Sequence, residues 1–115
     1  MATEISTLKP LVEGTELTTS TVSVYTVPAS TKATIKSLSI FNDDSANHTV
    51  TIHIVPSGGA VALATKRYKE IVYAGKTFDI DCLHILNAAA TLRVSCDSNS
   101  VCSIAAYGFE ITNVS

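Results

Sequence analysis

The sequence predicts an all-β protein: a single antiparallel β-sandwich, of jelly-roll or Ig-like type, with about seven to nine strands. Most of the 115 residues alternate between apolar and polar at every second position and are rich in Val, Ile and Thr, as half-buried strands are. Turn-forming clusters such as NDDSAN, PSGG and DSNS interrupt these runs at short intervals. A chain of this length is the size of one domain, and it shows no linker or internal repeat.

The chain begins with a segment that does not read as a central strand. Residues 1–14 contain Pro10, Gly14 and scattered apolar residues without clean alternation, which predicts an N-terminal arm or edge segment. Residues 15–115 are predicted to form the sandwich, starting with the strand runs ELTTS and VSVYTV. An extended N-terminal arm can bind a neighbouring molecule, so its apolar side chains are candidate interface residues. They are Ile5, Leu8, Leu11 and Val12.

The next run, TKATIKSLSIFN, is expected to contain an irregularity. Leu38 and Ile40 share one face of an ideal strand, whereas Ala33 has the opposite parity. A β-bulge near Lys36 or Ser37 would bring all of these apolar residues to the same face.

Three pairs of consecutive runs are predicted to form β-hairpins. The first joins TKATIKSLSIFN to HTVTIHIVP across NDDSAN, and its simplest register places Ile40 opposite Val50. The second joins YKEIVY to FDIDC across AGKT. The third joins TLRVSC to VCSIAAYGFEI across DSNS and places Cys96 opposite Cys102. Between the first two hairpins, residues 60–70 are expected to form a short turn of helix or a loop across the sandwich.

The closing strand has two apolar faces. Cys102, Ile104 and Ala106 share one parity, and Tyr107 and Phe109 share the other. One face fills the sandwich, so the other must lie under a second sheet, under the arm or against a partner. Because only 16% of the residues are charged, a partner is favoured, and Tyr107 and Phe109 join the candidate interface residues.

The three cysteines are expected to be structural. Cys82, Cys96 and Cys102 each share the parity of neighbouring apolar residues, as small hydrophobic side chains do. The tight Cys and His spacing of zinc sites is missing, so neither a metal nor a cofactor is expected. A Cys96–Cys102 disulfide stays open, because a hairpin allows its geometry while cytosolic synthesis disfavours it. No base or cluster of positive charge lies near a cysteine in the sequence, which argues against a catalytic thiol.

Three motif-like patterns receive structural interpretations. Ala74–Thr77 copies the end of a phosphate-binding loop but lacks the first glycine, so a hairpin turn is expected. Asp43, Ser45 and Asn47 copy the start of a calcium loop without its glycine or closing Glu, which leaves at most a weak, open calcium contact. His53 lies on the polar face of its strand and is expected to be solvated or at an interface. We therefore expect no catalytic residues and no enzyme.

Charge and hydropathy exclude two further classes of function. The net charge is −2, and no basic cluster is longer than Lys66–Arg67, so nucleic-acid binding is disfavoured. No run approaches the roughly 18 apolar residues of a membrane span, and the first residues do not read as a signal peptide. Synthesis in the cytoplasm is expected.

The order of three segments resembles a group of small β-sandwich proteins encoded among the structural genes of tailed bacteriophages. The segments are VYTVPASTKATIKSLSIFNDDSANHTVTIHIVPSGG, IVYAGKTFDIDCLHILNAAATLRVSC and AAYGFEI, and they cover most of residues 24–111. Ala89-Ala90 stands where such proteins often have Gly-Asp before Thr-Leu. The resemblance implies a virion component made in the host cytoplasm. A capsid decoration or cement protein bound to the major capsid protein is favoured over a neck or tail accessory.

Together, the residues and the resemblance predict a non-enzymatic structural protein that forms a dimer or trimer. A receptor- or carbohydrate-binding module of a tail fibre is the competing class, although the predicted loops lack an aromatic residue on which a sugar could stack. An enzyme of jelly-roll or cupin type would need a cluster of His and Glu ligands that the sequence does not show.

Overall fold

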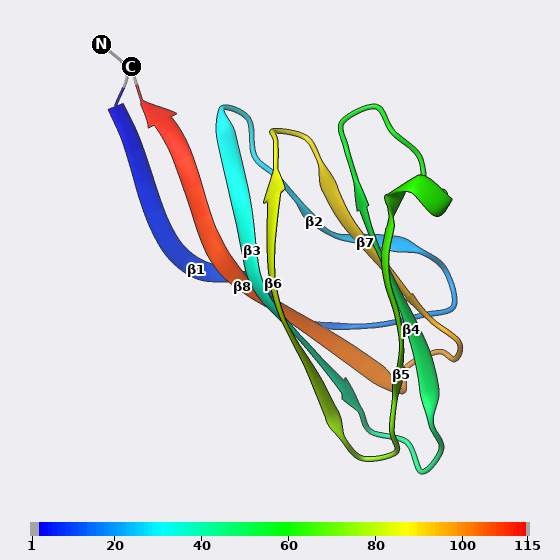
Figure 1. The fold of residues 1–115 in the computed structure, drawn as a ribbon. Coiled ribbons are helices and arrows are strands. Elements are labelled where there is room, and N and C mark those ends of the chain that lie inside the picture. The colour runs from blue at the N-terminus through cyan, green and yellow to red at the C-terminus, as the bar shows by residue number, and fades with distance from the viewer. Residues whose placement is uncertain (1–2, 115) are drawn as a thin grey trace.

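The computed structural model describes residues 3–114, and the side chains of residues 6–112. Over these residues the chain forms two four-stranded antiparallel sheets packed face to face (Figure 1). Sheet A contains, in spatial order, β1 (Thr3–Glu16), β8 (Cys102–Val114), β3 (Thr31–Asn42) and β6 (Thr77–Leu86). Sheet B contains β2 (Val22–Thr26), β7 (Thr91–Cys96), β4 (His48–Val55) and β5 (Lys66–Val72). The predicted β-sandwich is confirmed, and its eight strands in two sheets are those of a jelly roll.

The three predicted hairpins are wrong. β3 and β4 lie in different sheets, and so do β5 and β6, and β7 and β8. Each turn carries the chain from one sheet to the other, so Ile40 pairs with Phe78 and Ile104 instead of Val50. Val50 pairs with Cys96 of β7. Alternation shows which face of a strand is buried, but it does not show which strand lies beside it.

The predicted β-bulge is confirmed. The register of β3 against both β6 and β8 shifts between Ile35 and Ser37. As a result, Ala33 and Ile35 face the core together with Leu38 and Ile40, and all four are fully buried.

The hydrophobic core lies between the two sheets. Burial of each large aliphatic side chain in it stabilises the fold by roughly 1.5–3 kcal/mol. The largest fully buried side chains are Leu17, Ile35, Leu38, Ile40, Ile52, Leu86, Leu92 and Ile104.

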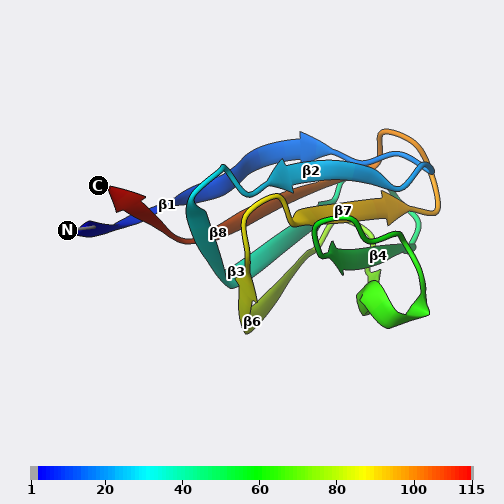
Figure 2. The same ribbon diagram turned by 90° about the horizontal axis from the view of Figure 1, so that it is seen from above.

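The first strand is an edge strand of sheet A rather than a free arm. Thr3 to Glu16 pair with β8, and the outer halves of β1 and β8 extend beyond sheet B as a two-stranded ribbon (Figure 2). Leu11 and Val12 lie where the ribbon enters the sandwich, and both belong to the core.

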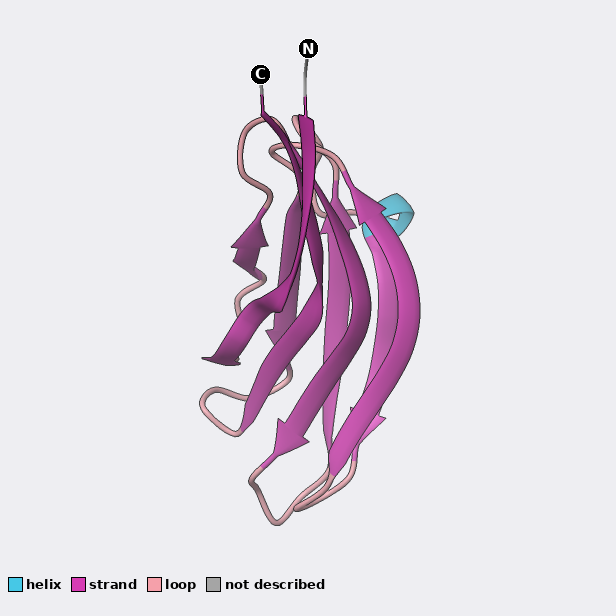
Figure 3. Ribbon diagram, turned by 90° about the vertical axis from the view of Figure 1, so that its left-hand side faces the viewer, coloured by secondary structure: helices cyan, strands magenta, loops and turns pink. Residues whose placement is uncertain are grey.

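The segment between β4 and β5 contains a single short helical turn. It is a 3-10 turn, η1 (Leu63–Thr65), drawn beside the sheets in Figure 3. The helical turn expected within residues 60–70 is therefore present over three residues, and the remainder from Lys66 onward is strand. Within residues 3–114, no helix is long and apolar enough to cross a membrane.

Candidate functional site

Apolar side chains line up across the outer face of sheet A. Leu8 on β1 pairs with Phe109 on β8, Phe109 pairs with Thr34 on β3, and Thr34 pairs with Ile85 on β6. Paired residues in a sheet point to the same side, so these residues form one row across all four strands. Leu8 is 72% exposed and Ile85 is 67% exposed. We call this row, with its neighbours on the same face, the outer apolar face; its members are Leu8, Leu83, Ile85, Tyr107 and Phe109.

Charged side chains lie on both sides of the row. Lys32 pairs with Ile111 of β8, one step along the face from the row. Asp81 and Asp79 lie on β6 on the opposite side of the row, and all three charged residues are exposed. The outer apolar face therefore has Lys32 on one side, and on the other side two aspartates together with the exposed Lys36 of the β3 bulge.

The candidate interface residues divide between this face and the core. Leu8, Tyr107 and Phe109 belong to the outer apolar face. Leu11 and Val12 are only 9% and 3% exposed and pack in the core, so they are not available to a partner. The side chain of Ile5 lies outside the described side chains. The N-terminal segment thus contributes Leu8 to the outer apolar face and Leu11 and Val12 to the core.

The thiols of Cys96 and Cys102 are buried and free. The two cysteines come from β7 and β8, in different sheets, and meet inside the sandwich instead of across a hairpin. Burial, together with a hydrogen bond to Cys96, raises the pKa of the Cys102 thiol to about 12. Burial also raises the pKa of Cys82, whose thiol donates to the carbonyl of Ile35 at 3.7 Å. Cys82 and Cys102 are therefore protonated near neutral pH, unlike catalytic thiols.

His53 is buried, contrary to the expectation of a solvated or interface residue. It does lie on the outer face of sheet B, but the η1 segment covers it, and its Nδ1 is 3.1 Å from Oγ1 of Thr65. Burial lowers the pKa of His53, and the positive charge of Lys66 adds to this effect.

Glu110 links the ribbon to sheet B. Its carboxylate accepts hydrogen bonds from Lys9 Nζ at 3.0 Å and from the hydroxyl of Tyr25. Burial favours the neutral acid, but the two hydrogen bonds and the charge of Lys9 outweigh it and hold the pKa of Glu110 below its usual value. Burial and the carboxylate together raise the pKa of the Tyr25 phenol, which stays a donor.

At one end of the sandwich, hydrogen bonds join two turns and engage Asn47, one of the three residues of the calcium-like pattern. Asn42 is fully buried, and its side-chain amide donates to the carbonyls of Ala46 and Val72, each at 2.9 Å. Oδ1 of Asn47 accepts the N–H of Ala74 at 3.0 Å. These contacts tie the β3–β4 turn to the Ala74–Thr77 turn, which connects the two sheets and is not a hairpin turn.

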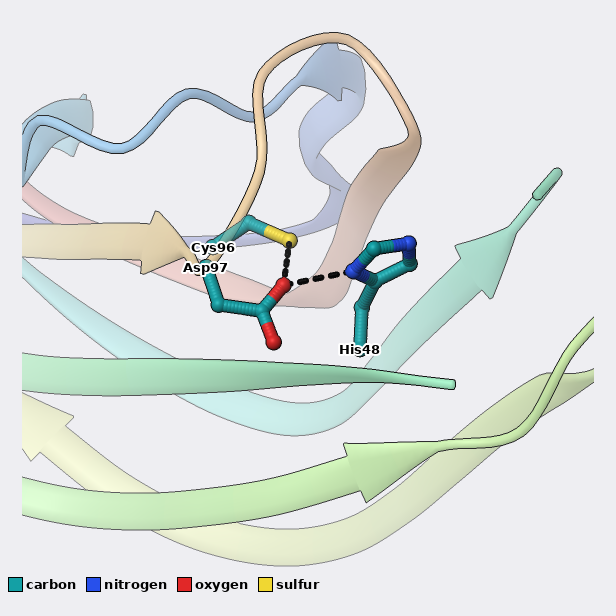
Figure 4. A group of neighbouring side chains, drawn as sticks. All are labelled: His48, Cys96 and Asp97. Carbon is teal, nitrogen blue, oxygen red and sulfur yellow. Dashed lines mark hydrogen bonds and ion pairs between the residues drawn. The ribbon is translucent and has the colours of Figure 1, made fainter. Parts of the chain in front are cut away.

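A polar cluster, unforeseen from the sequence, lies where the β3–β4 and β7–β8 turns meet. His48 is buried at the start of β4, with Nδ1 2.6 Å from Oδ1 of Asp97 and Nε2 2.6 Å from Oδ2 of Asp44. The hydrogen bonds to Asp44 and Asp97 raise the pKa of His48. Oδ2 of Asp97 also accepts the N–H of Thr49 at 3.0 Å, and the Cys96 thiol lies 3.7 Å from Oδ1 of Asp97 (Figure 4). Asp44 and His48 are four residues apart and Cys96 and Asp97 are adjacent, but no short spacing in the sequence joins the first pair to the second.

No family model and no curated protein matches the sequence. A chain of a solved structure described as "Bacillus endospore appendages form a novel family of disulfide-linked pili" is 14% identical, with a TM-score of 0.51, over 96% of this chain and 88% of that chain. A chain of the T13 IBDV viral particle is 10% identical, with a TM-score of 0.43, over 98% of this chain and 31% of that chain. A chain of the infectious bursal disease virus VP2 subviral particle is 8% identical, with a TM-score of 0.38, over 96% of this chain and 33% of that chain. This chain thus spans about a third of the viral chains, and its likeness to the Bacillus appendage chain is a likeness of fold.

Proposed function

We propose that this protein is a non-catalytic structural subunit that self-associates through the outer apolar face and attaches to the surface of a virion. The observation that carries the proposal is the row of Leu8, Phe109 and Ile85, which crosses every strand of sheet A and is not covered by the described part of the chain. Water-exposed apolar rows of this kind mark protein–protein contact surfaces. The jelly-roll fold, shared with the Bacillus appendage chain, is compatible with such a role.

The charges around the row favour a second copy of this chain as the partner. In a two-fold dimer the same face is used by both copies, and a two-fold axis that runs along the row places one margin of the face against the other margin of the partner. Lys32 of each copy would then face Asp81 of the other, on either side of a shared apolar centre. An arrangement of this kind buries the apolar row and places an opposite charge against each Lys32.

Sedimentation of the purified protein at micromolar concentration tests this dimer. We expect the wild type to sediment as a dimer and Leu8→Lys to raise the dissociation constant by roughly 10- to 100-fold, because a lysine must be desolvated within the interface. Ile85→Lys should act in the same way from the other edge of the row. Leu63→Lys is the matched control: Leu63 is 84% exposed, but it lies on η1 beside sheet B.

Circular dichroism on each variant separates a lost interface from a lost fold. A monomeric wild type would contradict the proposal, and so would equal effects of Leu8→Lys and Leu63→Lys. Dimers that weaken only with the sheet A variants would support it.

The proposed place of the subunit is the shell of a tailed bacteriophage, as a decoration or cement protein, in keeping with the resemblance of the sequence to phage structural proteins. Quantitative mass spectrometry of purified particles provides the test. A copy number comparable to that of the major capsid protein supports a shell protein, whereas a handful of copies supports the neck or tail alternative. Absence from the particles would exclude a virion component.

A filament subunit is a second candidate, favoured by the likeness of fold to a chain of pili. Those pili are disulfide-linked, but Cys96 and Cys102 of this chain are buried between the sheets and not available to a neighbouring copy. Cys82 is half-buried, with its thiol bonded to the carbonyl of Ile35. A filament that is not linked through Cys82 would need non-covalent contacts such as those of the outer apolar face. Electron microscopy of the concentrated protein distinguishes filaments from discrete dimers.

A further inference from the structure

We propose that His48, Cys96 and Asp97 form a binding site for a divalent transition-metal ion, with zinc the best match. The site lies at the end of the sandwich where the β3–β4 and β7–β8 turns meet (Figure 4). It does not depend on the proposed assembly role, because none of its residues belongs to the outer apolar face.

The donor atoms are already gathered at nearly the required spacing. One ring nitrogen of His48, Sγ of Cys96 and one carboxylate oxygen of Asp97 lie within 4.8 Å of one another. In a tetrahedral zinc site with bonds of about 2.0–2.3 Å, ligand atoms lie roughly 3.5 Å apart. The Cys96–Asp97 separation of 3.7 Å fits this spacing, and the His48–Asp97 separation of 2.6 Å must open by about 1 Å. Asp97 can make that movement because about half of its side chain is exposed.

The chemistry of the donors selects the type of metal. Zinc binds imidazole nitrogen, thiolate sulfur and carboxylate oxygen, whereas calcium and magnesium take oxygen ligands. The fourth position would be taken by water or by the thiol of Cys102, which is buried in the same core cluster as Cys96. His48 between two aspartates is an ordinary ion-pair arrangement and does not by itself indicate a metal. The thiol of Cys96 beside them is the donor that indicates a transition metal.

A second observation concerns the groups that hold these ligands in place. Metal-binding histidines usually donate their other ring N–H to a carboxylate, which fixes the ring and its tautomer. Asp44 occupies that position, with Oδ2 2.6 Å from Nε2 of His48, and it leaves Nδ1 directed toward Asp97 and the site. The other ligand is held as well, because the N–H of Thr49 donates to Oδ2 of Asp97. Asp44 is therefore a positioning residue for the metal ligand His48.

Cobalt(II) titration of the reduced protein tests the site, because a cobalt–thiolate bond gives a charge-transfer absorption that oxygen and nitrogen ligands do not give. We expect one cobalt per chain with this absorption, and its loss when zinc is added in competition. Calcium should not displace the cobalt. Cys96→Ser should abolish the charge-transfer absorption, and His48→Gln should abolish tight binding.

The pair Asp44→Asn and Asp43→Asn provides the sharpest comparison. Both remove one negative charge from the same turn, but only Asp44 contacts His48. Asp44→Asn should weaken zinc binding by roughly 10- to 100-fold, and Asp43→Asn should leave it unchanged. Circular dichroism of the metal-free variants confirms that each is folded, and Asp44→Asn serves where Cys96→Ser does not fold. Absence of the thiolate absorption in the wild type, or equal affinities of the two Asn variants, would overturn the proposal.

Discussion

Gly108 lies where β8 passes close to the backbone of β3, and its replacement by alanine is the most direct test of this fold. It pairs with Ile35, at the point where the β-bulge shifts the register of β3. A Cβ atom on Gly108 would lie 1.8 Å from the carbonyl oxygen of Thr34 and 2.9 Å from its carbonyl carbon. Both atoms are backbone, so no side-chain rotation can relieve the overlap.

The size of the effect follows from that distance. Close carbon–oxygen contacts between strands are about 3.3 Å long, so β3 and β8 would have to separate by roughly 1.5 Å. Overpacking of this kind costs about 3 kcal/mol, and one or two weakened ladder hydrogen bonds add about 1 kcal/mol each. We expect Gly108→Ala to lower the free energy of unfolding by about 4 kcal/mol, a large part of the roughly 5–15 kcal/mol of a small domain.

Urea unfolding followed by far-ultraviolet circular dichroism measures this loss, provided that the variants share the m-value of the wild type. Gly75→Ala is the matched control: Gly75 has φ of +66°, but a Cβ there meets no atom within 4 Å. That variant should lose only about 1 kcal/mol, from the left-handed backbone conformation. If Gly108→Ala loses no more than Gly75→Ala, the close approach of β3 to β8 is not as described.

Two further predictions concern the loss of stability at acidic pH and the role of the N-terminal segment in folding. The pKa of Glu110 is lower in the folded protein than its usual 4.5, so its contribution to stability is present above that pH and is lost as the pH falls through the folded value. Thermal unfolding across this range should therefore show a shallower acidic decline in Glu110→Gln than in the wild type, and identical slopes would contradict the assigned hydrogen bonds. Deletion of residues 1–12 removes Leu11 and Val12 from the core and should destabilise the chain by about 3–5 kcal/mol, whereas deletion of residues 1–8 should leave a cooperative unfolding transition. Equal unfolding midpoints for the two truncations would show that neither core residue matters.

The sequence is sufficient to predict which side of each strand faces the core. In β8, Ile104 and Ala106 point inward while Tyr107 and Phe109 point outward, as their parity predicts. The bulge in β3 was predictable for the same reason. The alternation of side chains is a local property of an extended backbone, so neighbouring residues report it without knowledge of the fold.

Strand partners were not predictable in this way. A turn such as NDDSAN shows that the chain reverses, but a reversal within one sheet and a crossing to the opposite sheet need the same turn residues. Both arrangements also bury the same apolar face of β3 and β4. The packing of two complete sheets selects the crossing, and that choice separates Ile40 from Val50 in the ladders and turns three expected hairpins into connections between sheets.

The outer apolar face and the proposed metal site differ in how far the sequence predicts them. Tyr107 and Phe109 could be assigned to an exposed face from their own strand, since exposure there follows from parity. Their alignment with Leu8 and Ile85 is visible only in the register of four strands that are far apart in the chain. The cluster of His48, Cys96 and Asp97 left no signal in the sequence, because its ligands come from two turns that meet when β4 and β7 pair in sheet B. Local residue patterns indicate which side chains are buried and where the chain turns, whereas contacts between distant segments form only when the sheets pack.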